Sequence, residues 1–294
     1  MNMPAASPFA RLVNDLTPLY GAGEARSVAQ IVFEDVFFTK KYAEKSFDEA
    51  ETAEYERIRA RLLAGEPIQY VLGEADFFGY KFEVNPHVLI PRQETEELVD
   101  WALKWLRAAP FPERPLRVVD VGAGSGCIGL TLRLKRSDLH ITSIDVSAEA
   151  LAVAEKNARR HRLPEADCSF VQGDALDTAV WASLPSAHLI VSNPPYIPQS
   201  ERRLMPARVL EHEPAGALFV SDEDPLLFYR VIAAFAKEKL LPGGALFFEC
   251  NEFNASSVQE LMIGMGYGSV TLRRDLSGAD RMVMGVCRVQ PPSV

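Results

Sequence analysis

An apolar run passes directly into three closely spaced glycines at Val118-Val119-Asp120-Val121-Gly122-Ala123-Gly124-Ser125-Gly126. Consecutive β-branched residues are typical of a buried strand, and the glycines that follow let the backbone come close to a ligand. The next segment, 127–136, reads as a helix whose N-terminus offers free N–H groups. Together these features predict the first strand, turn and helix of an α/β domain, with a ligand site at the end of the strand.

Further strands and helices alternate on both sides of this turn. We expect strands at 117–121, 140–146, 169–172, 188–192 and 245–250, and helices at 94–108, from Ser147, at 225–240 and at 256–265. Such alternation predicts a parallel sheet. The last two strands, 269–274 and 281–288, are joined by a short turn and must be antiparallel. The predicted fold is therefore α/β and Rossmann-like, with a mostly parallel seven-stranded sheet and an antiparallel last strand.

The chain before this region has a different pattern. Apolar residues recur at helical spacing between 8 and 73, and Gly65 followed by Pro67 is a typical helix end. Aromatic and β-branched residues around Gly79 predict a hairpin between 76 and 90. We predict a small helical domain over 1–75, a β-hairpin linker over 76–92 and a catalytic domain over 93–294. One aromatic series is expected in the helical core, with a groove for a protein substrate as the alternative: Phe33, Phe37, Phe38 and Tyr42.

Composition excludes several classes of protein. The net charge of −9 argues against a general nucleic-acid binder, and the first 75 residues are themselves acidic. The four cysteines and five histidines lack metal-binding spacing, so we expect no metal. Neither a signal peptide nor a membrane span is apparent. We expect a cytoplasmic monomer that contacts neither membrane nor nucleic acid directly.

Two cofactors compete for the glycine turn. Gly124, Gly126 and Gly129 fit the dinucleotide pattern, and Asp145 lies 21 residues after Gly124. These glycines, however, begin late after the strand. Glycines at 122, 124 and 126, with Asp120 inside the strand, better suit a nucleoside without a pyrophosphate, namely S-adenosylmethionine. A tight turn without a ligand is the structural alternative.

Acidic residues end the next two strands. Asp145 would accept hydrogen bonds from two ribose hydroxyls, and Asp174 with the backbone of Ala175 would bind the amino edge of adenine. Either aspartate on its own is equally well explained as a cap or turn residue. Because the carboxyl ends of parallel strands meet at one edge of the sheet, the three sites together predict a nucleoside pocket.

A second motif, Asn193-Pro194-Pro195-Tyr196, follows the apolar strand at 188–192. Two prolines stiffen an extended backbone. They would hold the Asn193 side-chain oxygen and the Pro194 carbonyl as paired acceptors for a planar NH₂ group, with Tyr196 against its flat face. The alternative is a stiffened loop without chemistry. The pattern favours methyl transfer to an amide or aryl amine nitrogen, although no general base is evident.

The chain resembles the glutamine N5-methyltransferases that act on peptide chain release factors. The resemblance covers nearly the whole length and is strongest in 89–96, 120–126, 193–196 and 213–218. It implies a class I S-adenosylmethionine-dependent methyltransferase whose substrate is the glutamine of a Gly-Gly-Gln loop. It implies that Asn193 to Tyr196 hold this glutamine. It also implies these cofactor-binding residues: Gly122, Ala123, Gly124, Ser125, Gly126, Asp145, Asp174, Ala175 and Asn193.

Other readings stay open. A ribosomal-protein glutamine methyltransferase and an N6-adenine methyltransferase share the Asn193 motif, and a non-catalytic module of translation is a third class. Arg92 either reaches the pocket or pairs with Glu94 or Glu96. A bulky residue sometimes follows the aspartate in this family where the chain has Ala175. Phe77 or Phe78 is the candidate to stack there instead, although core packing is favoured for both.

Overall fold

The computed structural model describes residues 7–42, 44–109 and 111–288. The chain divides into two compact units, Met1–Gly73 and Glu74–Val294. The first unit has an apolar core of its own, and the second has two larger cores, one on each face of a sheet.

The first unit is helical, as predicted. It comprises α1 (Pro8–Asp35), α2 (Glu49–Leu63) and α3 (Ile68–Leu72). Helix α1 bends at Gly21, whose φ of 75° and ψ of 160° are not helical. Helix α2 begins with a capping box between Asp48 and Glu51. It ends just before Gly65, whose φ of +84° is the left-handed conformation expected of a residue that stops a helix.

The aromatic core of this unit differs from the prediction at one residue. Phe33 and Phe37 are buried, and Tyr42 stacks on Phe9 with ring centroids 4.6 Å apart. Phe38 is 87% exposed and has a φ of +49°. The prediction that it lies in the core is wrong because α1 ends at Asp35, so helical spacing no longer determines which way its side chain points.

The second unit begins with an antiparallel hairpin of β1 (Glu74–Phe77) and β2 (Tyr80–Glu83). Phe78 and Gly79 form its turn, and both have positive φ. The buried side chain of Asn157, in the helix that follows the fourth strand, holds the hairpin: its Oδ1 accepts from the Glu83 N–H at 2.6 Å, and its Nδ2 donates to the Glu83 carbonyl at 2.9 Å. The hairpin is therefore part of the second unit.

The main sheet has the predicted topology. Its strand order is β10-β11-β9-β6-β3-β4-β5. Strand β11 is antiparallel to both neighbours, whereas the pairs among β9, β6, β3, β4 and β5 are parallel. The strands are β3 (Leu116–Val121), β4 (Leu139–Asp145), β5 (Cys168–Gln172), β6 (Ala187–Ser192), β9 (Leu240–Glu249), β10 (Gly268–Arg274) and β11 (Asp280–Val286).

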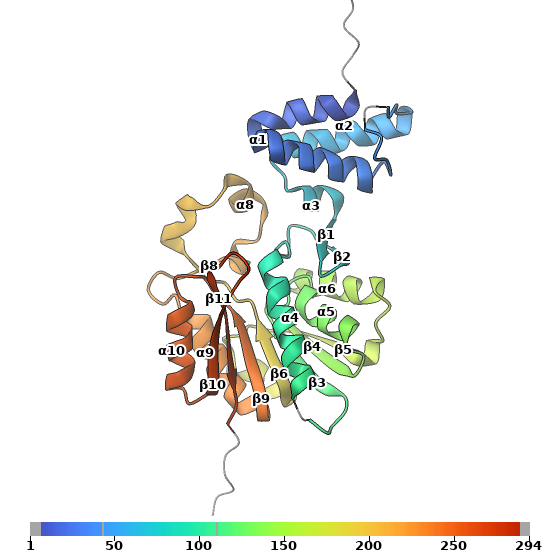
Figure 1. Cartoon of the computed structure of the whole chain (residues 1–294). Helices are drawn as coiled ribbons and strands as arrows, with labels where there is room; N and C mark the ends of the chain where they lie inside the picture. Colours follow the sequence, from blue (N-terminus) through green and yellow to red (C-terminus); the bar gives the residue numbers. More distant parts are fainter. Residues whose placement is uncertain (1–6, 43, 110, 289–294) are drawn as a thin grey trace, which may run out of the picture. The chain divides into compact units, whose positions relative to one another are not determined.

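Helices cover both faces of this sheet (Figure 1). Successive strand residues point to opposite faces, so Val118 packs in one core while Val119 and Val121 pack in the other. One face is covered by α4 (Gln93–Ala108), α5 (Cys127–Lys135) and α6 (Ala148–Arg160). The other is covered by α7 (Thr178–Ser183), α9 (Leu227–Lys239) and α10 (Ala255–Gly264).

A segment between β6 and α9 was not predicted. It forms a small parallel sheet of β7 (Ile197–Pro198) and β8 (Phe219–Val220), which brackets α8 (Ala207–His212). Short 3₁₀ turns occur at Gln199–Leu204 and Ala215–Ala217, and another, Glu165–Asp167, precedes β5. Within the described ranges, none of the helices combines the length and apolar character that crossing a bilayer requires.

Candidate active site

A cavity of about 400 Å³ opens at the carboxyl ends of the central parallel strands. Its lining comes from the turns after β3, β4, β5 and β6, from residues 86–95, from residues 214–217 between β7 and β8, and from α9. The structure brings ten of the twelve predicted site residues to this lining: Gly122, Ala123, Gly124, Ser125, Asp145, Asp174, Ala175, Asn193, Pro194 and Pro195. Gly126 and Tyr196 lie outside the described lining.

The glycine turn owes its shape to left-handed backbone. Gly122, Gly124 and Gly126 have φ of 73°, 55° and 77°, a region that other residues enter at a cost. The Gly122 and Ala123 N–H groups both donate to the Ile144 carbonyl at 2.9 Å, which pins the turn to β4. Gly126 serves packing, because a Cβ there would lie 2.9 Å from Leu130 Cδ1.

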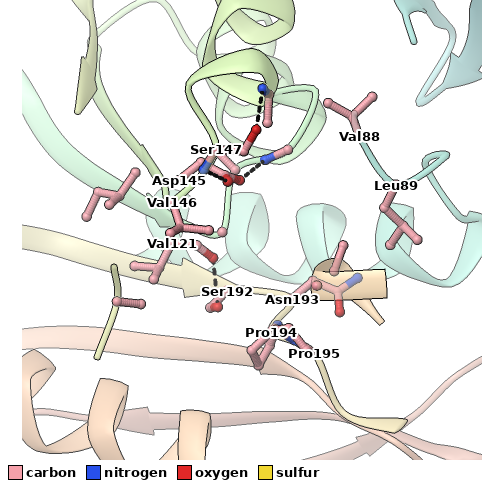
Figure 2. A pocket seen from close by; sticks show the side chains of 18 of the residues that line it. Val88, Leu89, Val121, Asp145, Val146, Ser147, Ser192, Asn193, Pro194 and Pro195 are labelled. Carbon is pink, nitrogen blue, oxygen red and sulfur yellow. Dashed lines mark hydrogen bonds between the residues drawn. The ribbon is translucent and has the colours of Figure 1, made fainter. Parts of the chain in front are cut away.

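Asp145 joins the turns after β3 and β4. Its Oδ2 accepts from the Gly124 N–H at 2.8 Å and its Oδ1 from the Ser147 N–H at 2.9 Å (Figure 2). Burial raises the pKa of this carboxyl, and the two backbone donors oppose that rise. Each oxygen keeps a lone pair free, so the carboxylate can accept further hydrogen bonds from a ligand.

Asp174 is more exposed than Asp145 and closes a local turn. Its Oδ1 accepts from the Leu176 N–H at 2.8 Å, and the Ala175 carbonyl accepts from Trp181 Nε1 at 2.8 Å. Phe77 is buried in the core, and Phe78 carries Lys135 5.2 Å above its ring. The described lining does contain two aromatic side chains, those of Phe228 in α9 and of His87.

The Asn193 motif begins where β6 ends, across the pocket from Asp145 (Figure 2). Ser192, the last strand residue, donates through Oγ to the Val121 carbonyl at 2.8 Å, which fixes the start of the motif to β3. Pro194 and Pro195 line the cavity with Asn193. Tyr196 is mostly buried between two apolar clusters instead, and burial raises the pKa of its hydroxyl.

Arg92 does reach the cavity lining, but its partner is a different carboxylate from either one expected. Its Nη2 donates to Glu213 Oε1 at 2.6 Å, and the Ile90 N–H donates to Glu213 Oε2 at 3.2 Å. The expected pairing with Glu94 or Glu96 is wrong; Glu96 instead accepts from the Phe78 N–H at 2.8 Å.

Sequence reasoning missed several lining residues, among them Val88, Leu89, Thr95, Phe228 and Ile232. Three of them lie in or beside the 89–96 motif, which was singled out for its resemblance and not for its position. Phe228 carries no local signal, because its role depends on how α9 packs on the sheet. Across the described ranges, no group of three or more His, Cys, Asp or Glu side chains is arranged to hold a metal ion.

The doubly covered sheet, its single antiparallel strand and a glycine-lined pocket at the strand ends define an α/β methyltransferase. The model of the methyltransferase small domain family matches residues 99–218. A crystal structure of a methyltransferase from Pyrococcus furiosus has the same fold, with a TM-score of 0.51 and 17% identity over 79% of this chain and 98% of that one.

Two curated relatives define the family more narrowly. The release factor glutamine methyltransferase of Flavobacterium psychrophilum is 37% identical over 279 residues, 93% of this chain and 95% of that protein. Its namesake from Bacteroides thetaiotaomicron is 42% identical over 232 residues, 78% of this chain and 79% of that protein. The chain belongs to the release factor glutamine methyltransferase family.

Proposed function

We propose that this enzyme transfers the methyl group of S-adenosylmethionine to the side-chain amide nitrogen of the glutamine in the Gly-Gly-Gln loop of a peptide chain release factor. The observation that carries the proposal is the position of Asn193 and Pro194, at the end of β6 and on the lining of the same cavity as the glycine turn. A planar amide placed there lies beside the cofactor pocket.

The residues of the pocket suit S-adenosylmethionine. A volume of about 400 Å³ lies within the roughly 300–1,000 Å³ of small-molecule sites. Gly122 and Gly124 leave open space where side chains would stand, since a Cβ at either meets nothing nearer than 4.0 Å. Asp145 and Asp174 present carboxylates for hydroxyl and amino donors, and Phe228 and Ile232 present apolar surface. When bound, the cofactor supplies an activated methyl group on a sulfonium.

The chain's own task is to position the amide. An amide nitrogen is a poor nucleophile because its lone pair is delocalised into the carbonyl. If Asn193 Oδ1 and the Pro194 carbonyl accept the two N–H hydrogens, the nitrogen is oriented and positive charge developing on it is stabilised. The balanced reaction breaks the sulfur–methyl bond, forms a nitrogen–methyl bond and releases one amide proton.

The helical unit is proposed to help recognise the protein substrate. Its surface carries the exposed ring of Phe38, and the same unit supplies none of the described residues of the cavity lining. Release factors are therefore the proposed partners, and S-adenosylmethionine the proposed cofactor.

Replacing Asn193 tests the amide clamp. Asn193→Ala is expected to lower kcat by roughly 10²–10³-fold, the effect of removing one such hydrogen-bonding group, while calorimetry finds cofactor affinity close to that of the unchanged chain. Asn254→Ala is the matched control, because the Asn254 side chain makes no cap hydrogen bond. Full activity of Asn193→Ala would contradict the proposed role.

A further inference from the structure

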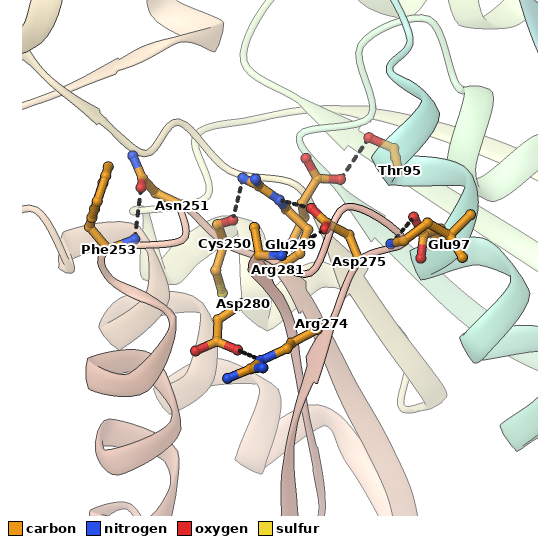
Figure 3. Close-up of polar contacts among 12 residues, drawn as sticks. Thr95, Glu97, Glu249, Cys250, Asn251, Phe253, Arg274, Asp275, Asp280 and Arg281 are labelled. Atoms are coloured by element: carbon orange, nitrogen blue, oxygen red, sulfur yellow. Dashed lines mark hydrogen bonds and ion pairs between the residues drawn. The ribbon is translucent and has the colours of Figure 1, made fainter.

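A buried carboxylate lies beside the Asn193 motif. Ser192 of β6 pairs in register with Phe248 of β9, so Asn193 and Glu249 are the next residues on neighbouring parallel strands. Thr95, in the first turn of α4, lies against both: its Oγ1 donates to Glu249 Oε2 at 2.6 Å, and Asn193 Nδ2 donates to Thr95 Oγ1 over a long 3.4 Å (Figure 3 shows the first contact).

The side chains of Thr95, Glu249 and Asn193 are buried to different degrees. Thr95 is 3% and Glu249 1% exposed, whereas Asn193 is half-buried at the cavity. A carboxylate in such a place must be hydrogen-bonded. Arg281 lies near it, but the Arg281 Nε is bound to Asp275 Oδ2 at 3.0 Å and its Nη1 to the Cys250 carbonyl at 3.3 Å. The Thr95 hydroxyl is therefore the close donor to Glu249.

The direction of these hydrogen bonds determines how the Asn193 amide is turned. An ionised carboxylate has no proton to give, so the Thr95 hydroxyl must donate to it. The lone pairs of Thr95 Oγ1 are then left to accept from the Asn193 NH₂ group. Turning the amide over would put Asn193 Oδ1 against another oxygen whose proton is already committed.

We propose that Thr95 and Glu249 are positioning residues, which hold the Asn193 carboxamide with Nδ2 inward and Oδ1 free to accept from the substrate amide. The inference rests on the proposed function, because only an amino or amide substrate needs Oδ1 as an acceptor. The inference gives a role to the Glu249 carboxylate and the Thr95 hydroxyl, two polar groups whose burial otherwise costs folding free energy.

This positioning of the Asn193 carboxamide depends on the charge of Glu249. Burial raises the pKa of this carboxyl to about 7, although the Thr95 hydrogen bond, the positive charge of Arg281 and the nearby Asn193 amide oppose the rise. When Glu249 is protonated, its carboxyl group can donate to Thr95 Oγ1. The Thr95 hydroxyl then no longer has to donate to Glu249. The acceptor orientation of Asn193 is then lost. Six titratable or charged groups of the described residues interact electrostatically with Glu249 or lie beside it: Glu94 of α4, Cys127 of α5, Tyr196 after β6, Tyr229 of α9, Cys250 after β9 and Arg281 of β11.

Kinetics of the full chain with a release factor test the proposal. Thr95→Val keeps the shape but removes the hydroxyl, and kcat is expected to fall about 10–100-fold, as misplacement of a reacting group does, with cofactor affinity unchanged. Thr95→Ser restores most of the loss. Thr131→Val is the matched control, since Thr131 is equally buried on α5 and its hydroxyl has no partner among the described residues. Equal kcat for Thr95→Val and Thr95→Ser would overturn the inference.

A second measurement needs no substrate. In ¹⁵N-labelled protein, the Asn193 side-chain amide is identified by its absence from Asn193→Ala. Its resonance is expected to titrate near pH 7, to lose that titration in Glu249→Gln and to shift in Thr95→Val. An Asn193 resonance insensitive to both changes would refute the positioning role. An unchanged chain that fails to methylate release factors, yet shows this titration, would refute the proposed function alone.

Discussion

The Arg92 guanidinium and the Glu213 carboxylate form an ion pair across 121 residues of sequence, with Nη2 and Oε1 2.6 Å apart. The Glu213 side chain is 2% exposed, whereas that of Arg92 is 35% exposed. The carboxylate also accepts from the buried Ile90 backbone. It thereby ties the segment before α4 to the segment between β7 and β8, and both segments line the cavity.

Removing this carboxylate should therefore cost stability and cofactor affinity together. Glu213→Ala leaves the Ile90 N–H without its partner, and we expect the free energy of unfolding to fall by about 1–3 kcal/mol. Urea unfolding measures this change. Glu211→Ala, which removes an exposed carboxylate two residues earlier in α8, is the control. Equal stability of the two variants would show that the ion pair is incidental.

Asn157 should be the hydrogen-bonding residue on which the pocket depends most. Its fully buried side chain bonds both backbone groups of Glu83, and its Nδ2 also donates to the Ser125 carbonyl in the glycine turn at 2.9 Å. Asn157→Ala is expected to destabilise the fold by about 3 kcal/mol, because several buried groups lose their partners. Lys156→Ala removes a surface ion pair to Glu83 and should cost below about 1 kcal/mol. Similar midpoints for both in urea would contradict this account.

The left-handed glycines differ in what they tolerate. Gly126→Ala combines a positive φ with contact to Leu130, and we expect a loss of about 2–4 kcal/mol from strain and overpacking. Gly278→Ala has the same sign of φ in an open turn and should lose about 1–2 kcal/mol from strain alone. Thermal unfolding compares the two. A larger loss at Gly278 would refute the packing role of Gly126.

The buried Asp120 should make stability depend on pH. Burial raises the pKa of this carboxyl to about 7, against the effect of the Gly129 N–H that donates to Oδ2 at 2.8 Å. The folded chain thus holds the proton more tightly than the unfolded chain, whose Asp titrates near 4. Unfolding releases that proton between these values, so this contribution to stability is present below about pH 4 and is lost as pH rises toward 7.

Asp120→Asn removes this titratable group, so the free energy of unfolding should decrease less steeply between about pH 4 and pH 7. Glu249 contributes a slope of the same sign, so part of the fall remains. Asp76→Asn is the control, because the side chain of Asp76 is 77% exposed. An unchanged slope in Asp120→Asn, measured by urea unfolding from pH 4 to 8, would refute the raised pKa of Asp120.

Most of the α/β fold was predictable because its signals are local. Buried parallel strands such as β3 and β6 are short apolar runs, the glycine turn stands directly after one of them, and the short connection between β10 and β11 allows one pairing. The segment from 197 to 220 was not predictable. Its strands are two residues long, too short for any periodicity, and it is held by contacts with residues more than a hundred positions away.

The site was predictable to the same extent. Residues that end successive strands could be placed together from topology alone, which brought Asp145, Asp174 and Asn193 to one edge. Residues that act across the fold could not. In the sequence, Glu249 is one residue of a predicted apolar strand and Asn157 is an ordinary residue of a predicted helix. Their roles follow from strand register and helix packing.

The most direct test of the central claim is to map where the methyl group goes. Purified protein and labelled S-adenosylmethionine are incubated in separate reactions with release factors, with ribosomal proteins and with DNA. The products are mapped by mass spectrometry. The account predicts one methyl group on the glutamine of the Gly-Gly-Gln loop, absent with Asn193→Ala. Label in ribosomal protein or DNA, with release factors unmodified, would contradict it.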